Sequence, residues 1–254
     1  MPFDAMDFDP HDSFGADVAA VYDDAPRGDE EAAVARLAAL AAGGSVLEFA
    51  IGTGRLALPL VATGLRVDGI ELSAAMIEQL RARPGGADLA VSCGDMATTA
   101  LPDRYALVFV AFNSIMNLLT QDGQAECVAN GARHLADGGL FVVENVVPDP
   151  MYTLRQDADG VDQYVRTGEL GSRGLRIETG RFDRATQRVD KCHVHLGGDG
   201  GVRLDPLALR YVWPSELDLM ARLAGLRLRE RHGGWSGEPF NGRSLRHVSV
   251  YERA

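Results

Sequence analysis

Apolar and polar positions follow two different rhythms along the middle of the chain. Short runs rich in Val, Ile, Leu and Phe are each followed by a segment with apolar residues at helical spacing. The runs predict strands over 45–50, 66–71, 88–93, 105–111 and 139–146, and the segments between them predict helices over 54–63, 73–83 and 121–136. Apolar strands that alternate with amphipathic helices predict an α/β fold with a doubly wound, mostly parallel sheet.

The alternation of apolar strands and amphipathic helices does not continue on either side of this region. Residues 17–41 predict two short helices that are broken near Pro26. Residues 150–212 hold short β-branched and aromatic segments between turn signals, which predict an antiparallel β insertion. A helix over 215–224 and strands over 226–231 and 245–252 then complete a seven-stranded sheet.

Pro59 fits this pattern poorly. Inside a helix over 54–63 it would forfeit a backbone hydrogen bond, at a cost of about 3 kcal/mol in an unkinked helix. We therefore expect a kink at this position.

The stretch VLEFAIGTGRLALPL, residues 46–60, runs from an apolar strand through a glycine turn into a helix. Such a turn directs free backbone N–H groups at one spot, and the missing side chains of Gly52 and Gly54 let a ligand approach the main chain. In an open parallel sheet this place lies beyond the carboxyl ends of the strands. The stretch predicts a ligand site.

Two cofactor classes compete for this site. Gly52, Gly54 and Ala57 satisfy the dinucleotide pattern G-x-G-x-x-G/A, with Glu71 at the end of the second strand to hold a ribose diol, which would indicate an NAD(P)-dependent oxidoreductase. Glu48 lies four positions before the first glycine, where a carboxylate suits a ligand that carries an ammonium group rather than a pyrophosphate.

An ordered set of four motifs resembles the class I S-adenosylmethionine-dependent methyltransferases. The motifs run from Glu48 to Gly54, then GIELS with Glu71, then CGDM with Asp95, then LVFVAFNSIMNL, and together they cover most of residues 45–146. The resemblance implies a Rossmann-like fold and transfer of a methyl group from S-adenosylmethionine to nitrogen or oxygen of a small molecule. The N-terminal helices and the insertion loosely resemble those of enzymes that N-methylate amino sugars and related natural products.

The resemblance also implies a place for each cofactor-binding residue. The turn from Ala50 to Gly54 would lie under the methionine part and the ribose, Glu71 would bind both ribose hydroxyls, and Asp95 would accept from the adenine amino group. The full set of expected cofactor-binding residues is Tyr22, Glu48, Ala50, Gly52, Thr53, Gly54, Glu71, Leu72, Asp95, Met96, Phe112 and Asn113.

The same resemblance divides the chain into three parts. Residues 1–44 would form an N-terminal helical lid, in which Tyr22 covers the cofactor. Residues 45–149 and 213–254 would form the S-adenosylmethionine-binding domain, and residues 150–212 an antiparallel insertion that binds the substrate.

A methylsulfonium group is a strong electrophile, so the protein mainly has to hold the acceptor in line and exclude water. An amine has to arrive neutral, whereas an alcohol or phenol benefits from a base. The candidates for a catalytic base are His193, His195, Glu144 and His232.

Each candidate base has a second interpretation. His193 and His195 share one strand face with Lys191, and this face either lines a pocket or meets solvent. Glu144 lies near the end of the fifth strand, where it either faces the acceptor or has a structural role in the following loop. His232 begins the loop HGGWSGEPF, whose Trp235 and Phe240 either wall the acceptor pocket or anchor the loop.

Composition narrows the range of partners. At 254 residues and 46% apolar content the chain can form one globular unit, and its formal net charge of −11 would repel nucleic acid. The motif AFNS after the fourth strand also differs from the N/D-P-P-Y/F pattern of enzymes that methylate nucleobase amines. We therefore expect a small-molecule acceptor, while a homo-oligomer is compatible with the sequence.

The cysteines, the longest apolar runs and the N-terminal charge bear on metal binding and on the cellular location. The chain has three cysteines, Cys93, Cys127 and Cys192, and their odd number and wide spacing argue against a disulfide framework and a zinc site. The H-x-H pair has no carboxylate at a suggestive spacing nearby in the sequence. We therefore expect no bound metal. No apolar run approaches the roughly 20 residues of a membrane span, and the N-terminus is acidic, so we expect a cytoplasmic protein. Lys191 is the only lysine among 25 basic residues, which we ascribe to codon bias.

One alternative outside the enzymes also fits the cofactor motifs. A catalytically inactive regulator or assembly partner would bind the cofactor and lack an acceptor pocket.

Overall fold

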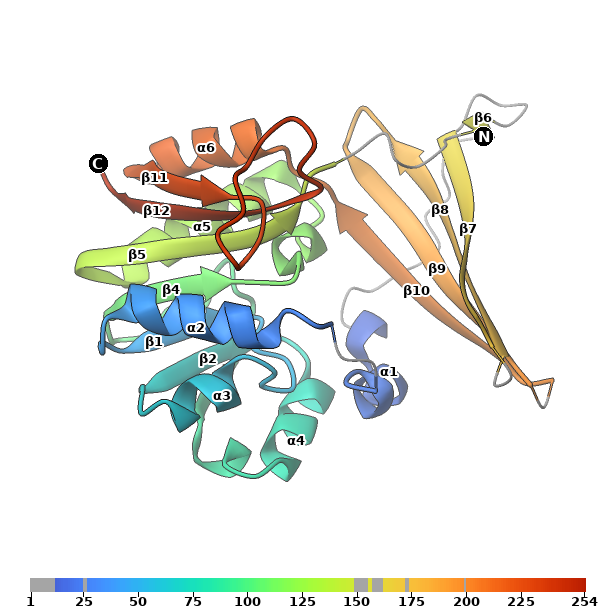
Figure 1. Ribbon diagram of the computed structural model, residues 1–254, viewed down its shortest axis with the longest axis horizontal. Helices are drawn as coiled ribbons and strands as arrows, with labels where there is room; N and C mark the ends of the chain where they lie inside the picture. The colour runs from blue at the N-terminus through green and yellow to red at the C-terminus, as the bar shows by residue number, and fades with distance from the viewer. Residues whose placement is uncertain (1–11, 25–26, 149–154, 157–161, 172–173, 199) are drawn as a thin grey trace.

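The computed structural model describes residues 12–24, 27–148, 155–156, 162–171, 174–198 and 200–254. Figure 1 shows a layered α/β domain and, beside it, a tilted antiparallel sheet, with the short helix α1 (Ala16–Val21) between them. Pro26, where we expect the first two helices to separate, lies outside the described residues.

The main sheet has seven strands in the order β11-β12-β5-β4-β1-β2-β3, which confirms the predicted doubly wound fold. The neighbours among β1 to β5 are parallel, and β12 is antiparallel to both β5 and β11. The strands are β1 (Val46–Phe49), β2 (Val67–Glu71), β3 (Ala90–Cys93), β4 (Tyr105–Val110), β5 (Leu135–Val146), β11 (Leu226–His232) and β12 (Arg246–Arg253). The strand order reverses between β1 and β4, so this is the switch point where α/β proteins bind ligands.

Helices cover both faces of the main sheet (Figure 1). The helices α2 (Glu30–Ala41), α3 (Ala57–Ala62) and α4 (Ala74–Ala82) bury Leu37, Leu60 and Leu80 in one core cluster. The helices α5 (Gln121–His134) and α6 (Pro214–Leu223) bury Cys127 and Leu217 in the other. In the part of the chain that the structure describes, no helix is both long and apolar enough to cross a membrane.

Two helix ends differ from the sequence prediction. Helix α3 begins at Ala57, so Pro59 lies in its first turn, where an N–H would have no partner within the helix and no hydrogen bond is forfeited. Helix α5 ends at His134, and β5 starts immediately afterwards instead of at 139. Gly138, at a φ of 73°, lets this early part of β5 bend. By contrast, Ser73 caps α4 as its position suggests, accepting from the Met76 N–H at 3.1 Å.

The insertion forms a separate antiparallel sheet in the order β10-β9-β8-β7-β6. Its strands are β6 (Arg155–Gln156), β7 (Asp162–Gly171), β8 (Gly174–Asp183), β9 (Arg188–Gly197) and β10 (Val202–Arg210). The register places His193 between Glu178 of β8 and Asp205 of β10. Because side chains alternate along a strand, these three residues share one face, while Cys192 and Val194 lie on the other.

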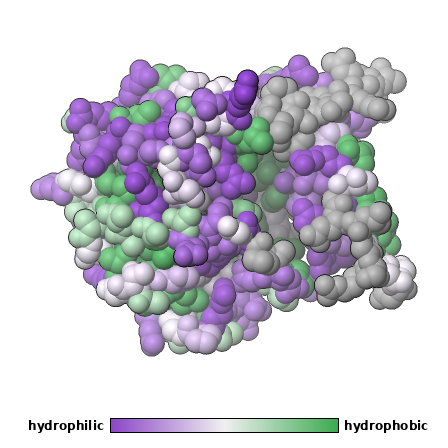
Figure 2. Space-filling model, in the orientation of Figure 1, coloured by the Kyte–Doolittle hydropathy of each residue, from purple (hydrophilic) through white to green (hydrophobic). Residues whose placement is uncertain are grey.

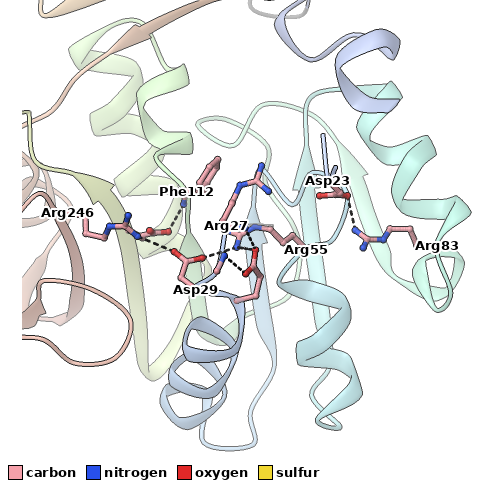
Figure 3. Close-up of polar contacts among 10 residues, drawn as sticks. Asp23, Arg27, Asp29, Arg55, Arg83, Phe112 and Arg246 are labelled. Carbon is pink, nitrogen blue, oxygen red and sulfur yellow. Dashed lines mark hydrogen bonds and ion pairs between the residues drawn. The ribbon is translucent and has the colours of Figure 1, made fainter. Parts of the chain in front are cut away.

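The N-terminal segment is tied to the start and the end of α4. The Ser73 hydroxyl donates to the Phe14 carbonyl at 2.6 Å. At the other end of the helix, Arg83 pairs with Asp23 at 3.0 Å, as Figure 3 shows. These contacts hold α1 over the carboxyl edge of the main sheet.

A buried arginine joins the insertion to the main domain. Arg210, at the end of β10, is 3% exposed and pairs with Glu216 of α6 at 2.7 Å. The same guanidinium donates to Gln124 of α5 and, at 2.9 Å, to Gln187 in the turn just before β9. Residues of β10, α5, α6 and the turn before β9 therefore meet at one charge, which holds the end of β10 and this turn against the main domain.

We predict that Arg210→Met destabilises the fold, because Glu216 would keep its charge without its main partner. The free energy of unfolding should fall by about 3 kcal/mol, as expected for a broken buried ion pair. Urea denaturation measures this loss. The matched control is Arg227→Met, whose exposed pair with Glu252 should contribute less than about 1 kcal/mol. Equal losses in the two variants would contradict the role of Arg210.

Candidate active site

The glycine turn after β1 has the backbone that the sequence predicts. Ala50, Gly52 and Gly54 have positive φ angles of 53°, 56° and 80°. A Cβ on Gly52 would meet only the Ala50 carbonyl, at 3.9 Å, so this residue leaves open space, whereas a Cβ on Gly54 would come within 2.3 Å of Leu80. Gly52 therefore leaves room for a ligand, and Gly54 lets α4 pack closely.

A cavity of about 560 Å³, which we call the cofactor cavity, lies at this turn. Of the expected cofactor-binding residues, Tyr22, Ala50, Gly52, Glu71, Leu72, Asp95 and Met96 line it. It also contains residues that sequence reasoning missed, namely Phe14, Ser114 and Asn117. The carboxylates of Glu71 and Asp95 give this cavity two strong acceptors for hydroxyl and amino groups.

Glu71 also holds the cavity in shape. Its Oε2 accepts from the Gly52 N–H and its Oε1 from the Ser73 N–H, both at 2.8 Å. Burial raises the pKa of this carboxyl above its ordinary value. One side chain therefore sets both the glycine turn and the entry to α4, and each of its oxygens keeps a second lone pair.

Glu48 and Thr53 lie under the turn rather than in the wall of the cavity. They are 5% and 2% exposed, and neither Glu48 Oε2 nor Thr53 Oγ1 has a hydrogen-bond partner among the described residues. Burial raises the pKa of Glu48 well above its usual range. A buried carboxyl oxygen without a partner, beneath an open glycine turn, fits a ligand with an ammonium group, as S-adenosylmethionine has.

Phe112 and Asn113 form a strained turn after β4. Their φ angles are 54° and 63°, a conformation that costs non-glycine residues about 1–3 kcal/mol each. Glu144 Oε2 accepts from the Phe112 N–H at 2.8 Å, and Asn113 Oδ1 accepts from the Val146 N–H at 2.6 Å. Glu144 is 4% exposed and lines neither cavity, so its carboxylate holds backbone at this turn.

A second cavity of about 1150 Å³, which we call the acceptor cavity, lies between the turn at Phe112, α1 and the insertion sheet. In the space-filling view the surface is hollowed between the main domain and the insertion (Figure 2). The two cavities share four lining residues, which are Phe14, Tyr22, Ser114 and Asn117. The two cavities therefore adjoin one another.

The insertion sheet contributes two pairs of imidazole and carboxylate to the acceptor cavity. His193 Nε2 lies 2.9 Å from Glu178 Oε2, and His195 Nε2 lies 2.9 Å from Asp205 Oδ2. The His193 bond lowers the pKa of Glu178 to about 2, and burial lowers the pKa of His195. Of the two interpretations of this strand face, the structure therefore shows the one that lines a pocket.

No metal centre accompanies these pairs within the described ranges. There, no group of three or more His, Cys, Asp or Glu side chains is arranged to hold an ion.

Arg27 is a further residue that sequence reasoning missed. Its guanidinium lies 4.1 Å from the ring centre of Phe112 and 4.6 Å from that of Tyr22, at the border of the two cavities. Arg55 lies 5.3 Å from the Phe112 ring and pairs with Asp29 (Figure 3). The sequence carried no local signal for this stack, because its members come from segments far apart in the chain.

His232 and its loop lie outside both cavities. His232 is 3.4 Å from Glu230 and 3.4 Å from Arg36 of α2, on the flank of the main sheet. Trp235 is 5% exposed within the core cluster beneath α2, and Phe240 lies 5.5 Å from the Arg231 guanidinium. The structure thus places the loop as an anchored cover of the main domain, and it does not wall the acceptor cavity.

We predict that Glu71→Ala weakens binding of S-adenosylhomocysteine by roughly 10- to 100-fold. The variant loses charge-assisted acceptors worth about 1.5–3 kcal/mol. Calorimetric titration measures the dissociation constant, with NAD as a ligand control and Glu78→Ala, on the exposed face of α4, as a variant control. An unchanged affinity would remove Glu71 from the cofactor site.

We predict that Glu48→Gln changes how stability depends on pH. Burial raises the folded-state pKa of Glu48, so its contribution to stability is largest below the unfolded pKa and is lost as pH rises through the folded pKa. Glutamine mimics the protonated form without titrating. Between pH 5 and 8 the melting temperature of the variant should therefore rise relative to the wild type, whereas parallel curves would contradict the shift.

Comparison with known proteins gives a consistent result. Residues 46–139 match the family described as Methyltransferase domain. The chain is 32% identical over 205 residues to a dTDP-3-amino-3,6-dideoxy-alpha-D-glucopyranose N,N-dimethyltransferase of Streptomyces fradiae, covering 76% of each chain. It is 26% identical over 213 residues to a cypemycin N-terminal methyltransferase of a Streptomyces species, covering 83% of this chain and 84% of that one.

Among solved structures, the CcbJ methyltransferase from Streptomyces caelestis is similar over almost the whole chain. The TM-score is 0.89 and the identity 38%, with 97% of this chain and 100% of that one covered. The similarity includes the insertion as well as the nucleotide-binding fold. The chain therefore belongs to the class I S-adenosylmethionine-dependent methyltransferases, in the branch that acts on small molecules in natural-product biosynthesis.

Proposed function

We propose that this enzyme methylates an amine nitrogen of a small molecule bound in the acceptor cavity. The observation that carries the proposal is that the two cavities adjoin and that the acceptor wall holds two imidazole and carboxylate pairs. The names of two relatives support nitrogen over oxygen, because one is an N-terminal methyltransferase and the other an N,N-dimethyltransferase.

In this proposal the glycine turn, Glu71 and Asp95 hold the cofactor, and Glu48 and Thr53 support it from beneath the turn. Bound S-adenosylmethionine supplies a methyl group on a positively charged sulfur. The protein's own part is to hold the amine in line with that group and to keep water out. Phe14 and Tyr22 line both cavities and would exclude water where the cavities meet.

His193 is our candidate for the proton acceptor. Most aliphatic amines are protonated at neutral pH and have no free electron pair until a proton leaves. With Glu178 ionised, the Nε2–H of His193 donates to its carboxylate, so Nδ1 carries the lone pair that can take this proton. The neutral amine would then have the electron pair that methyl transfer requires, and Glu178 would stabilise the imidazolium. His195 and Asp205 form a second pair with the same arrangement.

The three parts of the chain take separate tasks in this proposal. The main domain binds the cofactor, the insertion binds the acceptor, and the N-terminal helices form the lid. A cytoplasmic location, a homo-oligomer and the absence of nucleic-acid and membrane partners stay predictions.

The test is methyl transfer to a panel of primary amines, secondary amines and phenols, read as S-adenosylhomocysteine release and product mass. We expect turnover with amines. His193→Gln should lower kcat by about 10²-fold near pH 7 and by much less near pH 10, where the amine is neutral without a base.

His232→Gln is the matched control, because His232 lies outside both cavities. It should leave kcat unchanged. Turnover with phenols alone would overturn nitrogen as the acceptor atom, and an equal loss in His193→Gln at both pH values would overturn its role as a base.

A further inference from the structure

The one lysine of the chain lies in the wall of the acceptor cavity. Codon bias explains why arginine replaces lysine elsewhere, but it does not explain why the single exception faces this cavity. Lys191 is on β9, two residues before His193 on the same strand face. The neighbouring charges and hydrogen bonds determine which ligand its ammonium group can bind.

The positive charge of Lys191 has no anionic partner within hydrogen-bond distance among the described residues. Its side chain is 19% exposed, and its nearest carboxylate oxygen is Glu178 Oε2 at 3.9 Å, too far for a hydrogen bond. That carboxylate already accepts from Tyr164 at 2.7 Å and pairs with His193. To the described residues Lys191 Nζ makes no hydrogen bond, so its three donors are available to a molecule in the cavity.

Lys191 has further cationic neighbours on the same sheet. Arg176 of β8 lines the same cavity, and no described residue pairs with it. The register puts Arg166 directly opposite Glu178, on this face as well. Burial, with these two guanidinium groups, lowers the pKa of Lys191, while Glu178 raises it. Lys191 and Arg176 therefore lie on a cavity wall whose carboxylates, Glu178 and Asp205, already pair with His193, His195 and Arg203.

We propose that Lys191 and Arg176 form a subsite that binds an anionic group of the acceptor, a carboxylate or a phosphate ester. An ammonium and a guanidinium group are the usual partners of such anions, and an anion between them would relieve their mutual repulsion. This inference rests on the proposed function, since the same molecule carries the amine. The acceptor is then an amine that also has a negative charge, and the charge at the sheet turns the amine toward the cofactor cavity.

The single lysine makes the subsite directly measurable. Limited acetylation with acetic anhydride can modify only Lys191 among the side-chain amines, and peptide mass analysis separates it from the N-terminus. The reaction is followed while phosphate, pyrophosphate, acetate or succinate replaces chloride at constant ionic strength. A bound anion shields the amine and favours its unreactive protonated form, so we expect saturable protection of about fivefold or more. The protecting class, phosphate or carboxylate, identifies the anionic group of the acceptor.

Two variants make the test specific. Arg176→Gln should raise the anion concentration for half-protection about fivefold or more, because one of two cations is lost. Arg229→Gln removes an arginine that is half exposed on β11 and lines neither cavity, so it should change nothing. Protection no greater than in chloride, or equal shifts in both variants, would overturn the subsite.

Failure of the subsite can be told apart from failure of the proposed function. Binding of S-adenosylhomocysteine and turnover of the amine panel are measured on the same samples. Amine methylation without anion protection would overturn only the subsite. Anion protection in a protein that methylates phenols and no amine would overturn only the proposed function.

Discussion

The reversal of strand order between β1 and β4 is the constraint on which the rest of this structure depends. The chain leaves these two neighbouring strands in opposite directions, so their following loops separate and open a hollow at the carboxyl edge of the sheet. The glycine turn after β1 and the strained turn at Phe112 and Asn113 are the two sides of that hollow. Both turns need backbone conformations that cost energy, and both are held by a buried carboxylate, Glu71 or Glu144.

The insertion gives this general fold a second wall. Its sheet places Glu178, His193 and Asp205 on the face toward the acceptor cavity, so the alternation along β8, β9 and β10 decides which side chains meet the acceptor. The buried Arg210 ties the end of β10 and the turn before β9 to α5 and α6. Without that connection the imidazole and carboxylate pairs would have no fixed place relative to the cofactor cavity.

Charge is distributed unevenly between the two cavities. Acidic groups, Glu71 and Asp95, face the cofactor cavity, where the donors of a nucleoside need acceptors. On the insertion sheet, Arg176 and Lys191 lack full compensation. A ligand pair with hydroxyl, amino and sulfonium groups on one side and an anionic amine on the other complements this arrangement. The overall charge of −11 conceals it, because net charge averages over regions of opposite sign.

The sequence by itself determined the elements whose signals are local. The strand and helix periods, the cap at Ser73 and the glycine turn each depend on residues within a few positions of one another, and together they predict the main sheet and most of the cofactor cavity. Only the tertiary structure decided the rest. The partner of Glu144 is 32 residues away, Glu178 meets His193 through strand register, and Arg27 reaches Phe112 through the docking of the N-terminal segment. Such contacts depend on how distant segments pack, which periodicity along the chain does not encode. For the same reason His232 was a candidate base in the sequence, and its position on the flank of the main sheet appears only in the fold.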